Sequence, residues 1–264
     1  PIAIHAAALL IVLSAALKAA QFPAHGWLAE MQETPTPVSA LLHAGILNGG
    51  TFLVVRLAGI VQLSAPALGA LIVVGGFTAA FASVVLVTES RMKTALAYSS
   101  AAHMGFMLLL CGIGAYSVAI VHLVAHSFYK AHAFLSSGSA VDAARVADVP
   151  SKSGKIPGLR ILLSYVVTAG IVWTIATIMG FAVFATPTNL ALASIMVVAL
   201  SHLMAQGASG EPSARVIGRT ALSVTLTALS FYALESGGGA VLAHAVPEAK
   251  APGVPLVVCC TRKP

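Results

Sequence analysis

Long apolar runs, separated by short polar or proline-containing stretches, dominate this chain. Residues 66–88 and 161–206 contain no Asp, Glu, Lys or Arg, and a membrane-spanning helix needs roughly 20 apolar residues. The second run is long enough for two helices, and Pro187 marks the turn between them because proline cannot continue the preceding helix. The pattern predicts an all-α, polytopic transmembrane helix bundle.

Proline and charged residues divide the apolar sequence into about eight membrane crossings. The first crossing is expected to be broken near Pro23, because proline lacks the N–H donor that a helix interior needs. The expected helices are 2–31, 37–63, 66–88, 92–113, 116–141, 159–185, 188–206 and 216–235.

The same reading predicts four regions along the chain. A membrane core at 1–141 carries the polar residues, and further transmembrane helices lie at 161–235. A basic loop at 142–160 joins them. The glycine-rich run after Ser236 is expected to end the last helix and to open an irregular tail, 236–264.

Composition agrees with membrane insertion. The 264 residues are 58% hydrophobic and 8% charged, whereas a soluble domain carries about 25% charged residues. The net charge of +6 comes mostly from alternate connecting loops, so the positive-inside rule predicts that the basic loops are cytoplasmic. No basic stripe lies on a soluble element, which excludes nucleic-acid binding.

Neither the chain start nor its cysteines indicate processing or metal binding. The chain begins with Pro1 and enters an apolar helix without a cationic leader or cleavage site, so we expect a fragment of a longer protein. Cys111 stands alone in a span, and Cys259-Cys260 lacks metal-ligand spacing. We therefore expect neither a zinc site nor a disulfide framework on this chain.

Lys18 lies in the first apolar run, three residues before the helix break Gln21-Phe22-Pro23. A charge inside a membrane helix is costly and usually faces a protein interior or a water-filled cavity. Non-helical backbone at membrane depth also needs such a cavity. The pattern favours a proton or cation pathway over the alternative, a snorkelling lysine beside an ordinary proline kink.

A second set of ionisable residues follows helical spacing. His122, His126 and Lys130 stand four residues apart, so on a helix they share one face, about 6 Å from one another along the axis. His132 points away from this line and is a secondary candidate. A His-x-x-x-His pair can bind a metal, but no acidic residue or cysteine completes a ligand set, so we expect no metal here.

Other basic residues could extend the pathway. His43 could be the next step after Lys18, since histidine exchanges protons near neutral pH; alone it would more often be a packing residue. His103 could continue the route. Lys93 could also do so or serve as a cytoplasmic anchor. His202 is a secondary candidate with a structural alternative.

Four stretches, taken in order, resemble the proton-translocating antiporter-like subunits of respiratory complex I and Mrp sodium/proton antiporters. The resemblance implies that the family lysine corresponding to Lys18 sits in a broken helix. It also implies that five further residues correspond to residues on a central hydrophilic axis of the family: His43, Lys93, His122, His126 and Lys130. The stretches are KAAQFPAHGWL at 18–28, ETPTPVSALLHAG at 33–45, MKTALAYSS at 92–100 and HLVAHSFYKA at 122–131.

Within this superfamily the chain is most similar to the DabB family, the membrane subunits of inorganic carbon pumps, through its stretches at 25–28, 42–50, 103–107 and 127–138. This implies a partnership with a DabA-like peripheral zinc subunit in the bacterial inner membrane. Carbon dioxide or bicarbonate uptake would be coupled there to protons or another cation such as sodium. No cofactor is expected on this chain, and zinc is expected on the partner.

Two departures from the family pattern limit this interpretation. The acidic partner of the broken-helix lysine belongs to an earlier helix that this sequence does not contain, and the expected helix 159–185 has no ionisable residue beyond Arg160. Two alternatives stay open: a subunit of complex I or an Mrp antiporter, and a non-conducting membrane scaffold. No soluble active site is visible, so the chain is not expected to be catalytic alone.

Overall fold

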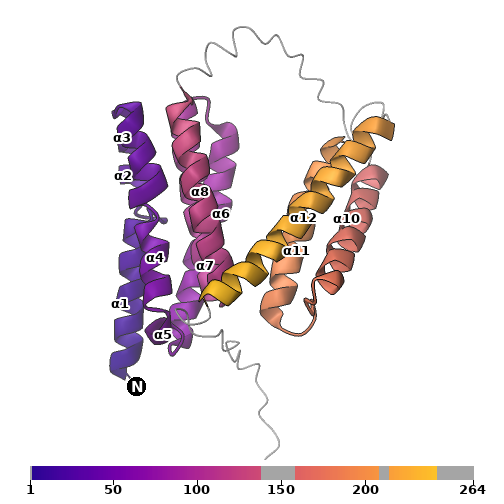
Figure 1. Ribbon diagram of the computed structural model, residues 1–264. Coiled ribbons are helices and arrows are strands. Elements are labelled where there is room, and N and C mark those ends of the chain that lie inside the picture. Colours follow the sequence, from indigo (N-terminus) through magenta and orange to yellow (C-terminus); the bar gives the residue numbers. More distant parts are fainter. Residues whose placement is uncertain (1, 138–157, 208–213, 243–264) are drawn as a thin grey trace, which may run out of the picture. The chain divides into compact units, whose positions relative to one another are not determined.

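The structure, a computed structural model, describes residues 2–137, 158–207 and 214–242. Every regular element in these residues is helical. The described residues fall into two compact units, one up to residue 137 and one from residue 158 to 242. Figure 1 shows the helices of both units.

The first unit, unit 1, contains ten helical elements: α1 (Ile2–Lys18), α2 (Gly26–Glu30), the 3-10 turn η1 (Met31–Glu33), α3 (Thr36–Leu41), the π turn η2 (Leu42–Ile46), α4 (Gly49–Arg56), α5 (Ala58–Val61), α6 (Ala65–Thr88), α7 (Met92–Gly112) and α8 (Tyr116–Leu135). The second, unit 2, contains α10 (Gly158–Ile178), α11 (Pro187–Gly207) and α12 (Ala214–Leu242).

Seven helical stretches of the described residues are long and apolar enough to cross a membrane. They confirm the prediction of an all-α, polytopic bundle. Of the eight predicted crossings, the first is the exception in length: α1 is apolar but has 17 residues, fewer than the roughly 20 that a crossing needs.

The predicted break of the first crossing is present, and it is wider than one proline. Residues 19–25 separate α1 from α2; Ala20 adopts a φ of 50° and the Phe22–Pro23 peptide bond is cis. The side chain of Gln21 is buried and donates to the Ala19 carbonyl over 2.8 Å. The backbone N–H of Phe22 donates to Thr78 Oγ1 of α6 over 3.1 Å, so protein groups satisfy part of the broken helix.

The second predicted crossing, 37–63, is not one continuous helix. The π turn η2 interrupts it, with the Leu47 N–H bonded to the Leu42 carbonyl over 3.1 Å, five residues earlier. Small residues then bring α4 against α1: a Cβ added at Gly50 would lie 2.5 Å from the Ala15 carbonyl oxygen and 2.8 Å from Ala19 Cβ. Such close backbone contact needs glycine.

Helices α6 and α7 also pack through glycine. A Cβ added at Gly75 would lie 2.6 Å from the Gly105 carbonyl oxygen, and one added at Gly105 would lie 2.6 Å from the Gly75 carbonyl oxygen. The two backbones therefore touch at this crossing. Small residues at helix contacts are typical of membrane bundles, where close packing drives association.

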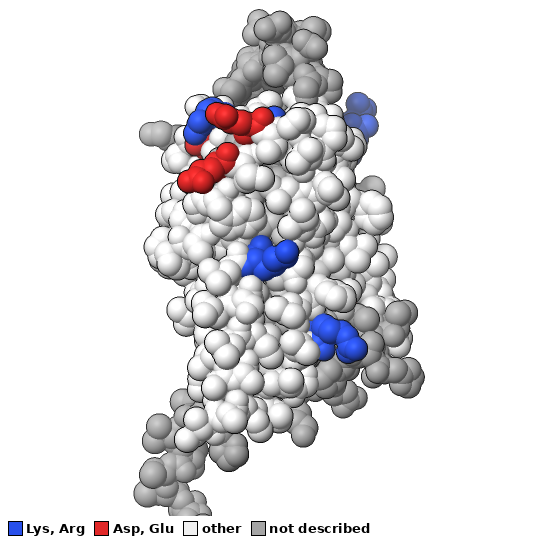
Figure 2. All heavy atoms as spheres, turned by 90° about the vertical axis from the view of Figure 1, so that its left-hand side faces the viewer, with Lys and Arg blue, Asp and Glu red and all other residues white. Residues whose placement is uncertain are grey.

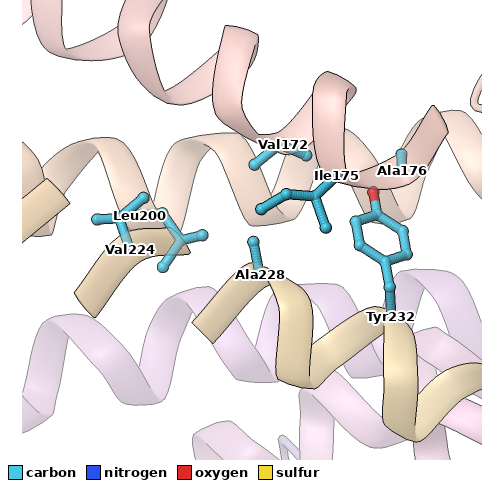
Figure 3. Packing of buried hydrophobic residues seen from close by; sticks show 7 residues of the cluster. All are labelled: Val172, Ile175, Ala176, Leu200, Val224, Ala228 and Tyr232. Atoms are coloured by element: carbon cyan, nitrogen blue, oxygen red, sulfur yellow. The ribbon is translucent and has the colours of Figure 1, made fainter. Parts of the chain in front are cut away.

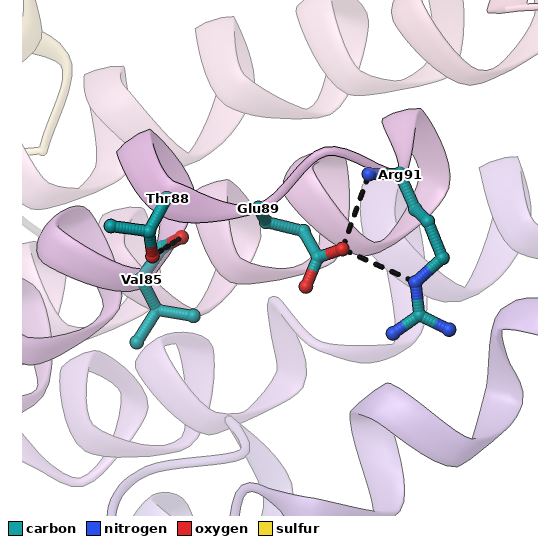
Figure 4. A network of polar contacts seen from close by, with 4 residues as sticks. All are labelled: Val85, Thr88, Glu89 and Arg91. Atoms are coloured by element: carbon teal, nitrogen blue, oxygen red, sulfur yellow. Dashed lines mark hydrogen bonds and ion pairs between the residues drawn. The ribbon is translucent and has the colours of Figure 1, made fainter.

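The short link between α6 and α7 is polar (Figure 4). Glu89 Oε1 accepts from the Arg91 N–H over 3.1 Å and from Arg91 Nε over 3.2 Å. The backbone and side-chain hydrogen bonds from Arg91 hold the pKa of Glu89 below its ordinary value. Thr88, the residue before Glu89, donates through Oγ1 to the Val85 carbonyl about one helical turn earlier, over 3.0 Å. That this link is cytoplasmic stays a prediction.

Charged side chains are sparse on the face shown in Figure 2. The acidic side chains of that face gather near one end, and most of its surface is uncharged apart from isolated basic side chains. A wide uncharged band is what lipid contact requires.

In unit 2, glycine and proline define the turn between α10 and α11. Helix α10 ends at Ile178, before the predicted Ala185, because Gly180 adopts a φ of 78°. The Phe181 N–H then bonds back to the Ala176 carbonyl over 2.8 Å, as in a glycine-terminated helix. Pro187 begins α11, as the sequence predicts for the turn.

The core of unit 2 lies between its three helices and is mainly aliphatic (Figure 3). Ala176, Val224 and Ala228 are fully buried. The cluster consists of Val172, Ile175, Ala176, Leu200, Val224, Ala228 and Tyr232.

The predicted end of the last helix is wrong. Helix α12 continues through Ser236 and the three glycines after it to Leu242. Each glycine costs roughly 1 kcal/mol of helix propensity, but an unbonded backbone group in an apolar medium costs more. The predicted loop residues 142–157 and the tail from 243, including Cys259-Cys260, lie outside the described residues.

Candidate functional site

Three basic side chains follow one face of α8 toward the interior of unit 1. Lys130 is fully buried, His126 is 4% exposed and His122 is half-buried. The rings of His122 and His126 lie 6.5 Å apart and nearly parallel. The i, i+4, i+8 spacing therefore places these groups on a common buried face, as the sequence predicts for a helix.

Helix α7 brings a third histidine to this face. His103 Nδ1 lies 3.0 Å from His122 Nε2, within hydrogen-bond distance. The His103 ring is also 5.2 Å from the His126 ring. His103, which the sequence indicates only as a possible extension, thus touches both α8 histidines. We call His103, His122, His126 and Lys130 the histidine–lysine cluster.

Lys130 is held by the backbone of α7. Its Nζ donates to the Leu96 carbonyl oxygen over 3.0 Å. The same carbonyl accepts from Ser100 Oγ over 3.0 Å. A carbonyl oxygen has two lone pairs and can accept several donors. A buried ammonium needs such a partner, because an isolated charge in an apolar interior is strongly unfavourable.

The π turn η2 carries His43 into the same region of α8. His43 is 1% exposed, and its ring stacks on Phe134 with a centroid distance of 4.3 Å and an angle of 11°. Phe134 is one helical turn beyond Lys130 on α8. The structure therefore places His43 at the end of the cluster where Lys130 lies.

A polar bridge joins α8 to the residues after the π turn. Asn48 Nδ2 donates to Ser127 Oγ over 2.6 Å and to the Ala44 carbonyl over 2.7 Å. Ser127 in turn donates to the Leu123 carbonyl. Sequence reasoning missed this bridge; a polar amide between apolar and glycine residues in a span is the signal that could have found it.

Several buried polar atoms of this region have no hydrogen-bond partner among the described residues. Both ring nitrogens of His126 are in this state, and so are His43 Nδ1, Asn48 Oδ1 and Thr51 Oγ1. A buried, unsatisfied polar group costs about 1–3 kcal/mol. Buried polar groups are otherwise paired with protein or ordered water, so this concentration marks a region that needs a polar occupant.

The structure does not bring every predicted residue to the cluster. Lys18 is exposed at the end of α1, with its Cε 3.3 Å from where a Cβ of Gly49 would lie. No hydrogen bond or ion pair joins Lys18 to the cluster within residues 2–137. Lys93, at the start of α7, donates to the Thr34 carbonyl over 3.0 Å.

Two further histidines lie on exposed surface. His132 is exposed on α8, off the line of the cluster, as its spacing predicts. His202 is exposed on α11 in unit 2, where its Nε2 lies 2.8 Å from Gln206 Nε2 on the same helix. This geometry agrees with the structural alternative for His202.

His25, beside the helix break, is a further histidine of interest that the sequence analysis does not include among its candidates. The His25 ring lies 5.6 Å from the Phe22 ring, 5.3 Å from the Phe81 ring and 6.2 Å from the Tyr98 ring. Its Nδ1 is buried and has no partner among the described residues. The sequence signal for His25 is its position two residues after Pro23.

The cluster is entirely basic. In the part of the chain that the structure describes, no group of three or more His, Cys, Asp and Glu side chains could hold a metal ion. A cluster of imidazoles and one ammonium can accept, hold and release protons, or repel and order cations, without a metal. The expectation of zinc on a partner subunit stays a prediction.

Comparison with known proteins identifies the family. The family described as NADH:quinone oxidoreductase/Mrp antiporter, transmembrane, matches residues 2–209. "Probable inorganic carbon transporter subunit DabB2" of Halothiobacillus neapolitanus is 40% identical over 231 residues, 88% of this chain and 42% of the relative. The corresponding DabB protein of Hydrogenovibrio crunogenus is 38% identical over 239 residues, 89% of this chain and 44% of the relative.

Respiratory subunits match a shorter part. "NADH-quinone oxidoreductase subunit L" of Neisseria meningitidis is 42% identical over 134 residues, 50% of this chain and 20% of the relative. The chain spans less than half the length of these curated relatives. The family match nevertheless covers most of the chain. The all-helical fold with its candidate membrane spans agrees with this match. The chain therefore belongs to the transmembrane family of NADH:quinone oxidoreductase and Mrp antiporter subunits.

Proposed function

We propose that this chain belongs to a membrane subunit of an inorganic carbon uptake complex and conducts protons, or another cation, through the histidine–lysine cluster. The relatives that match nearly the whole chain are named as inorganic carbon transporter subunits. Subunit L of NADH-quinone oxidoreductase matches only half of it. This difference in coverage favours carbon uptake over respiratory electron transfer.

One observation carries the conduction proposal: His126 is buried among basic neighbours and both of its ring nitrogens lack a partner in the described residues. An imidazole in a dry apolar core would be selected against, because its polar atoms would stay unsatisfied. Water molecules would satisfy both nitrogens, one accepting from the ring N–H and one donating to the other nitrogen. A conducting pathway therefore accounts for a histidine that packing does not explain.

The neighbouring groups provide the steps of a proton relay. His103 and His122 are already within 3.0 Å, so a proton can pass directly between their nitrogens. Each neutral imidazole has one N–H and one acceptor nitrogen, so it takes a proton on one side and releases another from the opposite side. The ring centroids of His103 and His126 lie 5.2 Å apart, and a water between their nitrogens would carry the proton from one ring to the other.

Lys130 would control how many protons the histidine–lysine cluster holds at one time. When charged, its ammonium disfavours a second positive charge on His126, which is one helical turn away, because like charges repel strongly in a poorly polarisable interior. When it releases its proton, a histidine can be protonated more easily. Its bond to the Leu96 carbonyl keeps the charge in place between transfers.

Lys18 would take part in transport through an ion pair with an acidic residue outside the cluster. It is exposed and lies apart from the cluster, and the resemblance implies that an acidic residue of an earlier helix partners it. We propose that Lys18 forms this ion pair in the assembled protein. The same resemblance supports a DabA-like zinc subunit as partner and the bacterial inner membrane as location, which co-purification of the protein from its native membrane would test.

A subunit of complex I or of an Mrp antiporter is the second candidate. The family as a whole and the 42% identity to subunit L support it. Co-purification separates the two candidates: a large zinc-containing soluble subunit indicates carbon uptake, and other respiratory or antiporter subunits indicate the second candidate. A non-conducting scaffold is tested by variants that leave the complex assembled.

The deciding experiment compares two histidines of α8 in the protein in its native complex. His126→Ala should abolish proton flux into proteoliposomes, followed with a pH-sensitive dye, and should abolish carbon-dependent growth. His132→Ala is the matched control, since it removes an exposed imidazole from the same helix, and it should preserve both. Normal flux in an assembled His126→Ala complex would support the scaffold and overturn the conduction proposal.

A further inference from the structure

Unit 2 has a groove at the end where α10 and α12 begin and α11 ends. The groove has a volume of about 210 Å3 and all three helices line it. Arg160 is its charged lining residue, and Leu163, Val167 and Ile217 supply apolar surface. A groove of this composition combines one cationic group with hydrocarbon-like walls.

The contribution of α10 follows helical spacing. Arg160, Leu163 and Val167 stand at i, i+3 and i+7, so they share one face of the helix. From Arg160 to Val167 this face is about 10 Å long at 1.5 Å per residue. The charge therefore lies at the outer end of the groove, and the apolar walls extend toward the middle of the membrane span.

The groove has a closed floor on its other side. A Cβ added at Gly207 would lie 2.7 Å from Thr220 Cγ2 and 2.9 Å from Thr220 Cβ, so the end of α11 touches α12. Packed helices thus bound the groove on this side.

The described charged side chains at this end of unit 2 are basic. Arg160 lies in the first turn of α10, Arg215 and Arg219 lie in the first two turns of α12, and neither helix has an acidic residue in its first turn. The amino termini of α10 and α12 add partial positive charge at this end, and the carboxyl end of α11 offsets part of it. This is also the side that the loop charges predict to be cytoplasmic, where anionic lipids attract basic residues.

We propose that this groove binds an anionic phospholipid, with its phosphate against Arg160 and an acyl chain along Leu163, Val167 and Ile217. A guanidinium presents five N–H donors in a planar fork, so it can donate to a phosphate while keeping other contacts. The apolar walls give no place for a free, fully hydrated anion. Basic pockets between transmembrane helices are known to suit anionic head groups.

The test measures lipid retention on the purified protein by native mass spectrometry, after exchange into nanodiscs of phosphatidylglycerol or phosphatidylcholine. Wild-type protein should retain phosphatidylglycerol in preference to phosphatidylcholine. Arg160→Gln should reduce this retention about tenfold, the loss expected for a charge-assisted hydrogen bond, and Arg160→Lys should keep most of it. Arg219→Gln is the matched control, because it removes the same charge from the same end outside the groove.

A second pair of variants tests the acyl-chain part. Val167→Phe fills the groove and should reduce retention, whereas Val198→Phe fills a different apolar groove of unit 2 and should not. Thermal unfolding of each variant in detergent checks that it is folded. Equal retention by Arg160→Gln and Arg219→Gln, or displacement of the lipid by millimolar inorganic phosphate alone, would overturn the proposal.

Discussion

Unit 1 and unit 2 are both bundles of apolar helices, but they bury different groups. Unit 1 encloses His43, His126 and Lys130, together with polar atoms that have no partner among the described residues. The core of unit 2 is aliphatic apart from Tyr232. The buried polar side chains of unit 2 carry hydroxyls in place of imidazoles or charges: Ser164 bonds to a carbonyl of its own helix, and Thr168 Oγ1 has no partner among the described residues.

This difference separates two roles within one membrane chain. Burying a basic group in a lipid-embedded bundle is costly, so it is retained where it is used. A core of small aliphatic side chains maximises close packing, which holds helices together where lipid is as apolar as the side chains. Under the proposed function, ion movement takes place in unit 1, and unit 2 contributes packing and the proposed lipid contact.

After the loss of flux expected for His126→Ala, the largest effect is expected at Lys130. Lys130→Met removes the only ammonium of the cluster with little change in volume, and proton flux should fall about 100-fold, the lower range for loss of a proton-transferring group. Stopped-flow measurement of internal pH in proteoliposomes checks this. Tyr129→Phe changes the adjacent, exposed side chain of α8 and should leave proton flux unchanged. An equal loss of flux in Tyr129→Phe would mean that any change to the packing of α8 lowers flux.

The next largest effect is expected at the contact between α6 and α7. Gly75→Ala places a methyl group 2.6 Å from the Gly105 carbonyl oxygen, and overpacking of this kind costs about 1–3 kcal/mol. Gly69→Ala on the same helix meets nothing within 4 Å and should be neutral or slightly stabilising. Unfolding in graded detergent mixtures measures both. Equal stability of the two variants would contradict the described crossing.

A comparable change in unit 2 should alter stability without altering transport. Ala228 is fully buried in the aliphatic core, so Ala228→Leu should cost about 1–3 kcal/mol. Leu226→Ala changes an exposed side chain of the same helix and should have little effect on unfolding. Proton flux per folded molecule should stay normal in both. A specific loss of flux in Ala228→Leu would show that the roles of the units are not separate.

The smallest effect is expected at the link between α6 and α7. The pKa of Glu89 is lowered, first by the Arg91 backbone hydrogen bond, so its stabilising contribution is present above the unfolded pKa and is lost as the pH falls through the lower, folded value. Glu89→Gln should therefore be slightly less stable than wild type at neutral pH and equal to it in acid. Exposed pairs contribute little. A larger stability difference in acid than at pH 7 would reverse the assigned sign.

Much of the fold follows from local sequence signals. Charge-free runs predict the long helices, and Pro23 predicts the break, because both depend on neighbouring residues and on the membrane alone. The persistence of α12 through Ser236 and the following glycines was not predictable in this way. Glycine preferences measured in water do not include the cost of exposing backbone groups to lipid.

The site was predictable only in part. The spacing of His122, His126 and Lys130 is a property of one helix, so it appears in the sequence. The contact of His103 with His122, and the bond from Lys130 to Leu96, depend on how α7 lies against α8. Such pairings are tertiary and have no local signature. Lys18 shows the converse, since its sequence position suggested a buried group and its side chain is exposed.

The π turn that carries His43 has a consequence for how this region can evolve. A π turn holds one residue more than an α turn, and losing that residue would restore a regular helix while rotating everything before it by about 100° relative to α4. His43 would then leave the Phe134 ring on which it stacks. Conservative substitutions of the other residues in 42–46 should therefore be tolerated better than a deletion there, because a deletion moves His43 even when its side chain is unchanged.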